Sequence, residues 1–91
     1  MATVASLQNR IRTIDGINSR IHHYNGRDVR DDRGDIPFYP FRKAAPGAWS
    51  VARWKKSRFA PNYPSFKVEV LDDSGKPVNG KSLLKNVRAG Y

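Results

Sequence analysis

Apolar residues near the start of the chain recur at helical spacing. In the segment 3–14 they are separated by three, four and three positions: Val4, Leu7, Ile11 and Ile14. This is the apolar stripe of an amphipathic helix. Thr3 or Ser6 can cap its start, and Gly16, which tolerates a left-handed backbone, can end it. The residues that fall off the stripe and are expected to face water include Arg10 and Arg12.

A strict alternation near the C-terminal end predicts a strand. In the segment 65–71, one side carries Phe66, Val68 and Val70, and the other carries Ser65, Lys67 and Glu69. Alternation of this kind is typical of a half-buried strand. Residues 72–75, DDSG, are expected to form a turn, and residues 76–78 a return strand. The tail, 82–91, fits either helix or strand, and we favour a strand because the hairpin offers it an edge to pair with.

The centre of the chain combines an extended connector with a short helix. Residues 36–49 contain three prolines, which remove backbone donors, so we expect an extended segment whose aromatic side chains can still fill the core. Ser50 then caps a helix that Pro61 and Pro64 end. The side of this helix expected to face the core carries Val51, Ala52, Trp54 and Phe59, and the side expected to face water carries Arg53 and Lys56.

Between the first helix and the connector, residues 17–31 can form a hairpin. Asn25-Gly26 is the strongest two-residue turn signal, because both residues adopt positive φ readily. Residues 27–35 alternate in charge and are expected to be a solvated loop. Together the elements predict one small basic α+β domain spanning 1–91, with an N-terminal amphipathic helix and a short central helix packed on a small antiparallel sheet.

Residues 75–82, GKPVNGKS, match the letters of a nucleotide-binding phosphate loop. Such a loop needs a long helix after it and a later strand with a metal-binding Asp, whereas only nine residues follow Ser82 and Pro77 removes one amide donor. We therefore interpret the segment as the turn after a strand. The surrounding V-x-V-x-D-x-x-G-x-P-V-x-G pattern, from Val68 to Gly80, resembles immunoglobulin-like and related bacterial β-modules, and this resemblance implies hairpin geometry here.

Several kinds of chemistry are absent from the composition. The chain has no cysteine, which excludes disulfides and thiolate metal sites and fits the cytoplasm. Its two histidines, His22 and His23, are adjacent, and neighbouring side chains diverge on helix and strand alike, so we expect no metal and no cofactor. No apolar run has the ~18 residues that a membrane span needs, so no membrane is expected.

Charge is the strongest functional signal. Lys and Arg number 17 against 8 acidic residues, a net charge of +9. The segment 36–68 contains no acid but seven cations interleaved with aromatics. A cationic surface with exposed aromatic rings suits DNA or RNA, since cations neutralise phosphates and rings stack on bases. The predicted nucleic-acid-binding residues are Arg42, Lys43, Arg53, Lys55, Lys56 and Arg58. Many of the aromatic residues, Trp54 and Trp49 among them, are equally expected to serve as core.

The favoured interpretation is a small non-enzymatic nucleic-acid-binding protein with little sequence preference. The first alternative is a protein-interaction module or small inhibitor, of the kind found among phage and mobile-element accessory proteins, that docks on an acidic or nucleic-acid-handling partner. The second is a small basic nuclease, in which His22 or His23 acts as general acid or base, assisted by Arg20 and Tyr24. The competing view of both histidines is that they lie on an exposed hairpin.

Overall fold

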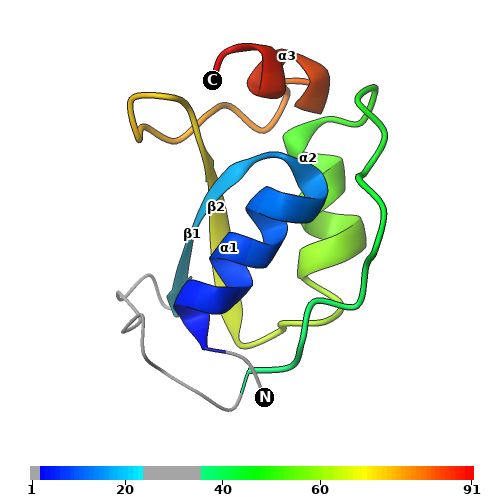
Figure 1. The fold of residues 1–91 in the computed structure, drawn as a ribbon, viewed down its shortest axis with the longest axis vertical. Helices are drawn as coiled ribbons and strands as arrows, with labels where there is room; N and C mark the ends of the chain where they lie inside the picture. Colours follow the sequence, from blue (N-terminus) through cyan, green and yellow to red (C-terminus); the bar gives the residue numbers. More distant parts are fainter. Residues whose placement is uncertain (1–2, 24–35) are drawn as a thin grey trace.

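The structure is a computed structural model that describes residues 3–23 and 36–91. The described elements follow in the order α1 Val4–Asp15, β1 Asn18–His23, α2 Val51–Trp54, the π-helical turn η1 Lys55–Phe59, β2 Phe66–Leu71 and α3 Leu84–Ala89. Figure 1 shows α2 and the connector that precedes it running along one side of the molecule, while α1 lies over the two strands. The predicted α+β class, with an N-terminal helix and a short central helix, is confirmed.

Helix α1 has the ends that its sequence predicts. Thr3 and Ser6 form a reciprocal capping box, in which each side chain accepts a hydrogen bond from the other residue's backbone amide. At the far end Gly16 adopts φ 70°, and its amide donates to the Arg12 carbonyl. Three of the four apolar stripe residues are fully buried, and Ile14 is partly buried against the core.

The sheet has two antiparallel strands in the described part of the chain. The register of β1 and β2 runs from Asn18 opposite Leu71 to His23 opposite Phe66. The first flank of the predicted 17–31 hairpin is therefore a strand, and it pairs with β2, far away in sequence. The expected turn at Asn25-Gly26 and the charged loop 27–35 lie outside the described residues.

The central helix changes pitch halfway along. Ser50 accepts a hydrogen bond from the Arg53 amide at 3.1 Å, which confirms the predicted cap. The chain then widens into η1, where the Ala60 amide reaches back five residues to the Lys55 carbonyl at 2.8 Å. Val51, Trp54 and Phe59 are buried as predicted, but the prediction for Ala52 is wrong: this residue is exposed. The buried residues of α2 are Val51 and Trp54, which are three positions apart and so lie on the same side of the helix. Ala52 lies on a different side and faces outward.

The favoured strand at the C-terminal tail is wrong, because residues 84–89 form α3. The return segment after β2 makes a single bridge, Leu71 to Pro77, and Pro77 has no amide with which to extend a ladder. Backbone bonds instead tie the tail to the start of α2, among them those from the Val51 amide to the Ser82 carbonyl and from the Leu84 amide to the Trp49 carbonyl. Leu84 and Val87 are then buried at helical spacing.

The segment that matches a phosphate loop is a turn. The Asp72 carboxylate accepts from the amides of Ser74 and Lys76, and Gly75 has φ 80°. The Lys81 amide donates to the Asn79 side chain rather than into an open anion nest. The helix that follows has only six residues, so the sequence-based interpretation as a turn is confirmed.

Candidate nucleic-acid interface

The connector is held in place by one buried carboxylate, Asp15, the last residue of α1, which is 0% exposed. Its oxygens accept hydrogen bonds from the Tyr39 hydroxyl, the Ala45 amide at 2.8 Å, the Trp54 indole N–H at 3.2 Å and the Arg58 guanidinium at 2.9 Å. We call these five residues the Asp15 cluster. Because the donors come from the connector and the α2–η1 helix, the cluster fixes both against the end of α1.

Arg88 reinforces the same junction from the C-terminal helix. Its guanidinium donates to the backbone carbonyls of Asp15 at 2.7 Å and of Ala45 at 2.9 Å. Gly16 lies directly beneath the Arg88 side chain, whose atoms are 3.6–3.8 Å from the place where a Cβ would project. The Asp15 cluster and Arg88 together therefore join α1, the α2–η1 helix, α3 and the connector.

Tyr39 serves the cluster as a hydrogen-bond donor to Asp15. Burial, followed by its hydrogen bond to the neighbouring Asp15 carboxylate, raises the pKa of the Tyr39 hydroxyl far above its usual range. The hydroxyl therefore holds its proton to a more alkaline pH than an exposed tyrosine does, and the hydrogen bond to Asp15 persists with it.

Arg58 belongs to this cluster, although the sequence predicts it as a nucleic-acid contact. Its side chain is 12% exposed, and besides Asp15 it donates to the Lys43 carbonyl at 2.7 Å. Its guanidinium lies 4.4 Å from the Phe41 ring centre and 5.9 Å from that of Trp49. Arg58 is therefore bound to other parts of the fold, whereas Arg42, Lys43, Arg53 and Lys56 are exposed.

A groove of about 490 Å³ lies between α1 and the connector, and we call it the arginine groove. Helix α1 contributes Ser6, Leu7 and Arg10, and the connector contributes residues 38–42. Phe38 is 68% exposed, in contrast to the buried Tyr39 beside it. The groove therefore brings together an accessible aromatic ring and two arginines, Arg10 and Arg42, that are distant in sequence.

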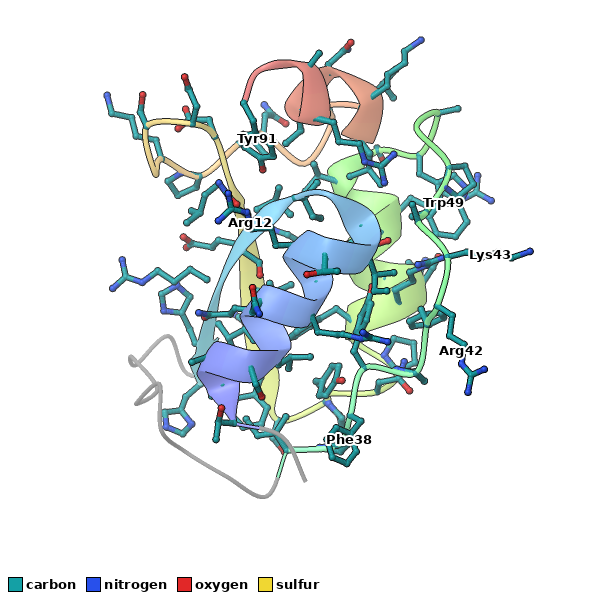
Figure 2. The ribbon with its side chains drawn as sticks, in the orientation of Figure 1. Arg12, Phe38, Arg42, Lys43, Trp49 and Tyr91 are labelled. Atoms are coloured by element: carbon teal, nitrogen blue, oxygen red, sulfur yellow. The ribbon has the colours of Figure 1, made fainter. Side chains whose placement is uncertain are left out.

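Three side chains of the connector that could contact a ligand, Phe38, Arg42 and Lys43, are exposed. Figure 2 shows Phe38, Arg42, Lys43 and Trp49 following one another along the same edge of the molecule. Arg42 and Lys43 are exposed, whereas Trp49 is partly buried and packs against the core. Arg53, which is also exposed, lies 4.8 Å from the Trp49 ring centre. These side chains continue the cationic surface beyond the arginine groove.

The remaining two predicted cations, Lys55 and Lys56, line a different groove, of about 400 Å³, beside β2. This groove shares no lining residue with the arginine groove. The six predicted residues are therefore divided: Arg42, Lys43 and Arg53 follow the connector edge, the two lysines lie at the second groove, and Arg58 belongs to the Asp15 cluster.

Sequence reasoning missed Arg10 and Phe38 as members of a site. Arg10 was predicted only to face water, which it does. Phe38 stands among several aromatics in the connector, and the sequence alone does not separate the exposed ring from the buried ones. The signal in the sequence that could have indicated an exposed Phe38 is the pair of prolines, Pro37 and Pro40, which hold the chain extended around Phe38. Trp54, by contrast, is fully buried, as the core expectation requires.

The two histidines of the nuclease hypothesis, His22 and His23, are the last two residues of β1. The His22 imidazole is 3.7 Å from the Glu69 carboxylate, and the His23 ring stacks on Phe66 with centres 5.8 Å apart. Tyr24, the proposed assistant, lies outside the described residues. Across residues 3–23 and 36–91, no three His, Cys or acidic residues gather as a metal site would require.

None of the helices in the described residues has the length and apolarity to cross a membrane. Comparison with protein-family models, curated proteins and solved structures finds no match to this chain.

Proposed function

We propose that this chain is a small non-enzymatic protein that binds single-stranded DNA or RNA along the arginine groove and the connector edge. The observation that carries the proposal is the exposed ring of Phe38 in one groove with Arg10 and Arg42. The volume of about 490 Å³ falls within the ~300–1,000 Å³ typical of ligand pockets. We place this activity in the cytoplasm, in keeping with the absence of cysteine.

Each part of the groove has a distinct role in this proposal. An unpaired base stacks on Phe38, an interaction worth ~1–3 kcal/mol per base. The two arginines neutralise the flanking phosphates and release their counterions. Lys43 and Arg53 extend the track along the connector edge. Stacking and phosphate contacts are tolerant of sequence, so binding has little base preference.

The test is a titration of fluorescently labelled DNA and RNA oligonucleotides with the full chain, followed by anisotropy at two salt concentrations. Phe38→Ala should weaken binding by ~1–3 kcal/mol with the salt dependence unchanged. The double variant Arg10→Gln/Arg42→Gln should lower the slope of log affinity against log salt by about 1.4, since each phosphate contact to a single strand contributes ~0.7.

A matched control is the double variant Lys76→Gln/Lys81→Gln, which removes the same charge from exposed positions in the turn after β2. It should retain the slope of the unaltered chain to within about 0.7. Equal losses in the control and in the groove variant would show that net charge alone drives binding. Salt-independent binding, or no binding at low salt, would overturn the proposal.

A second candidate function, a protein-interaction module, is favoured by the second groove. That groove has mainly apolar walls, with Lys55 and Lys56 at its edge, which suits a segment of a partner protein.

A further inference from the structure

We propose that the groove between the α2–η1 helix and β2 is a docking site for a short acidic, amphipathic segment of a partner protein. We call it the lysine groove. It is lined by Ala52, Lys55, Lys56, Phe59, Ala60, Phe66, Lys67 and Val68. The inference stands on different residues from the nucleic-acid proposal and does not depend on it.

The walls of the lysine groove are mainly apolar. Phe59 and Val68, which are 2% and 5% exposed, belong to the core and form its floor. Ala52 and Ala60 are exposed and have short side chains, so they leave space between the longer side chains of the α2–η1 helix. Apolar side chains of a partner can therefore reach the floor and bury area there, at ~25 cal/mol per Å².

Positive charge borders this apolar surface. Lys55 is half-buried and Lys56 is exposed, and no lining residue is acidic. Among the described residues, no carboxylate lies within ion-pair distance of either lysine. Lysine stems cover apolar surface while their ammonium groups remain in water. The complementary occupant thus has aliphatic side chains facing the floor and carboxylates facing the rim.

The π-helical turn is the local device that builds the lysine groove. Both rim lysines and Phe59 of the floor belong to η1, and the bond from the Ala60 amide to the Lys55 carbonyl closes the widened turn. Turns of this kind are uncommon and occur frequently at functional sites. The irregular pitch of the helix therefore coincides with the groove.

The aromatic residues favour a protein segment over nucleic acid here. Phe59 is buried, and the ring of Phe66 is stacked on His23 at an interplanar angle of 23°. The Phe59 ring is therefore closed to a base and the Phe66 ring has one face covered by His23, in contrast to the exposed ring of Phe38 in the arginine groove. Point charges on flexible stems above an apolar floor suit carboxylates and aliphatic side chains instead.

The test uses nuclear magnetic resonance on the isotope-labelled full chain with three synthetic peptides. The first alternates leucine and glutamate, the second alternates leucine and lysine, and the third replaces each leucine of the first with serine. We expect only the first peptide to bind, with the largest amide shifts at Ala52, Lys56 and Ala60. The double variant Lys55→Gln/Lys56→Gln should weaken that binding at least tenfold.

The matched control is again Lys76→Gln/Lys81→Gln, which should bind the first peptide as the unaltered chain does. A second variant, Ala60→Gln, fills the groove without changing any charge and should also weaken peptide binding. Circular dichroism establishes that each variant is folded. Phe38→Ala should leave peptide binding unchanged, which separates this inference from the nucleic-acid proposal.

Two outcomes would overturn the inference. One is peptide shifts that map outside the lysine groove or that respond equally to the control variant. The other is an oligonucleotide that shifts Ala52 and Ala60 while the leucine–glutamate peptide does not, which would assign the groove to nucleic acid.

Discussion

Arg58 and Arg42 come from the same acid-free stretch of sequence, and their surroundings in the fold give them different roles. Arg58 lies over Phe41 and donates to the buried Asp15 carboxylate, with only 12% of its side chain exposed. Arg42 lines an open groove with the exposed ring of Phe38. Both are cations in an acid-free stretch of sequence. The buried carboxylate of Asp15, supplied by α1, gives Arg58 a structural role. In the described part of the chain, Arg42 has no such buried acid beside it and remains accessible.

The largest effect should come from removing the structural arginine. Arg58→Ala leaves Asp15 as a buried carboxylate without its cation, which costs ~3–5 kcal/mol of unfolding free energy. Arg42→Ala, the matched substitution in the groove, should change stability by less than about 0.5 kcal/mol. Urea denaturation of the two variants measures both values. Similar stabilities would refute the distinction between the two arginines.

The next effect concerns the hydroxyl that Tyr39 donates to Asp15. Tyr39→Phe removes a hydrogen bond to a charged acceptor, for which we expect a loss of ~1.5–3 kcal/mol. The control is Tyr63→Phe, which removes a bond to the neutral Pro37 carbonyl and should cost only ~0.5–1.5 kcal/mol. The same denaturation experiment compares them. A control that costs more than Tyr39→Phe would argue against a dominant Asp15 cluster.

Alkaline pH should lower the stability of the fold before it removes the charge of the arginines in the arginine groove. Burial raises the pKa of Tyr63 from 10.0 to about 12. The pKa of Tyr63 in the folded state lies above its value in the unfolded state. The contribution of the protonated Tyr63 hydroxyl to stability is therefore complete below pH 10.0 and is lost as pH rises toward about 12. The unfolding free energy, measured by urea titration at stepped pH, should fall across that window. Tyr63→Phe should show a shallower decline, and an identical decline would contradict this assignment.

The smallest effect should come from the start of α1. Thr3→Ala removes one half of the capping box and should cost ~0.5–1 kcal/mol. Arg10, near the middle of α1, lines the arginine groove, and Asp15, at the end of α1, forms the Asp15 cluster. Fraying that begins at Thr3 should therefore disturb the arginine groove before the Asp15 cluster. Amide hydrogen exchange should accelerate at Ser6 and Leu7 and stay slow at Asp15. Uniform acceleration along α1 would mean that the two sites are not separable.

Local features of this fold were predictable from the sequence because their partners are close in the chain. Thr3 caps α1 through a residue three positions away, and Gly16 ends it through a carbonyl four positions away. The alternation in β2 likewise reports which side is buried. In each case the physical cause lies within a few residues, so a pattern in the sequence is sufficient.

Features decided by distant residues were not predictable. Whether Arg58 is accessible depends on Asp15, which lies 43 residues earlier. The tail is helical because backbone bonds at Ser82 and Leu84 direct it toward α2, whereas the pattern of its apolar residues fits two kinds of element. The arginine groove joins Arg10 to a connector about thirty residues later, and only the folded arrangement of α1 reveals that pairing.

The positions of the two indoles have a spectroscopic consequence. Trp54 is fully buried and its N–H is fixed on Asp15, whereas Trp49 is partly buried beside Arg53 at the connector edge. Emission from Trp54 therefore reports unfolding, while emission from Trp49 responds to a molecule arriving at the connector edge. With one tryptophan replaced at a time by phenylalanine, the unlabelled chain can signal its own folding and its own occupancy through separate chromophores.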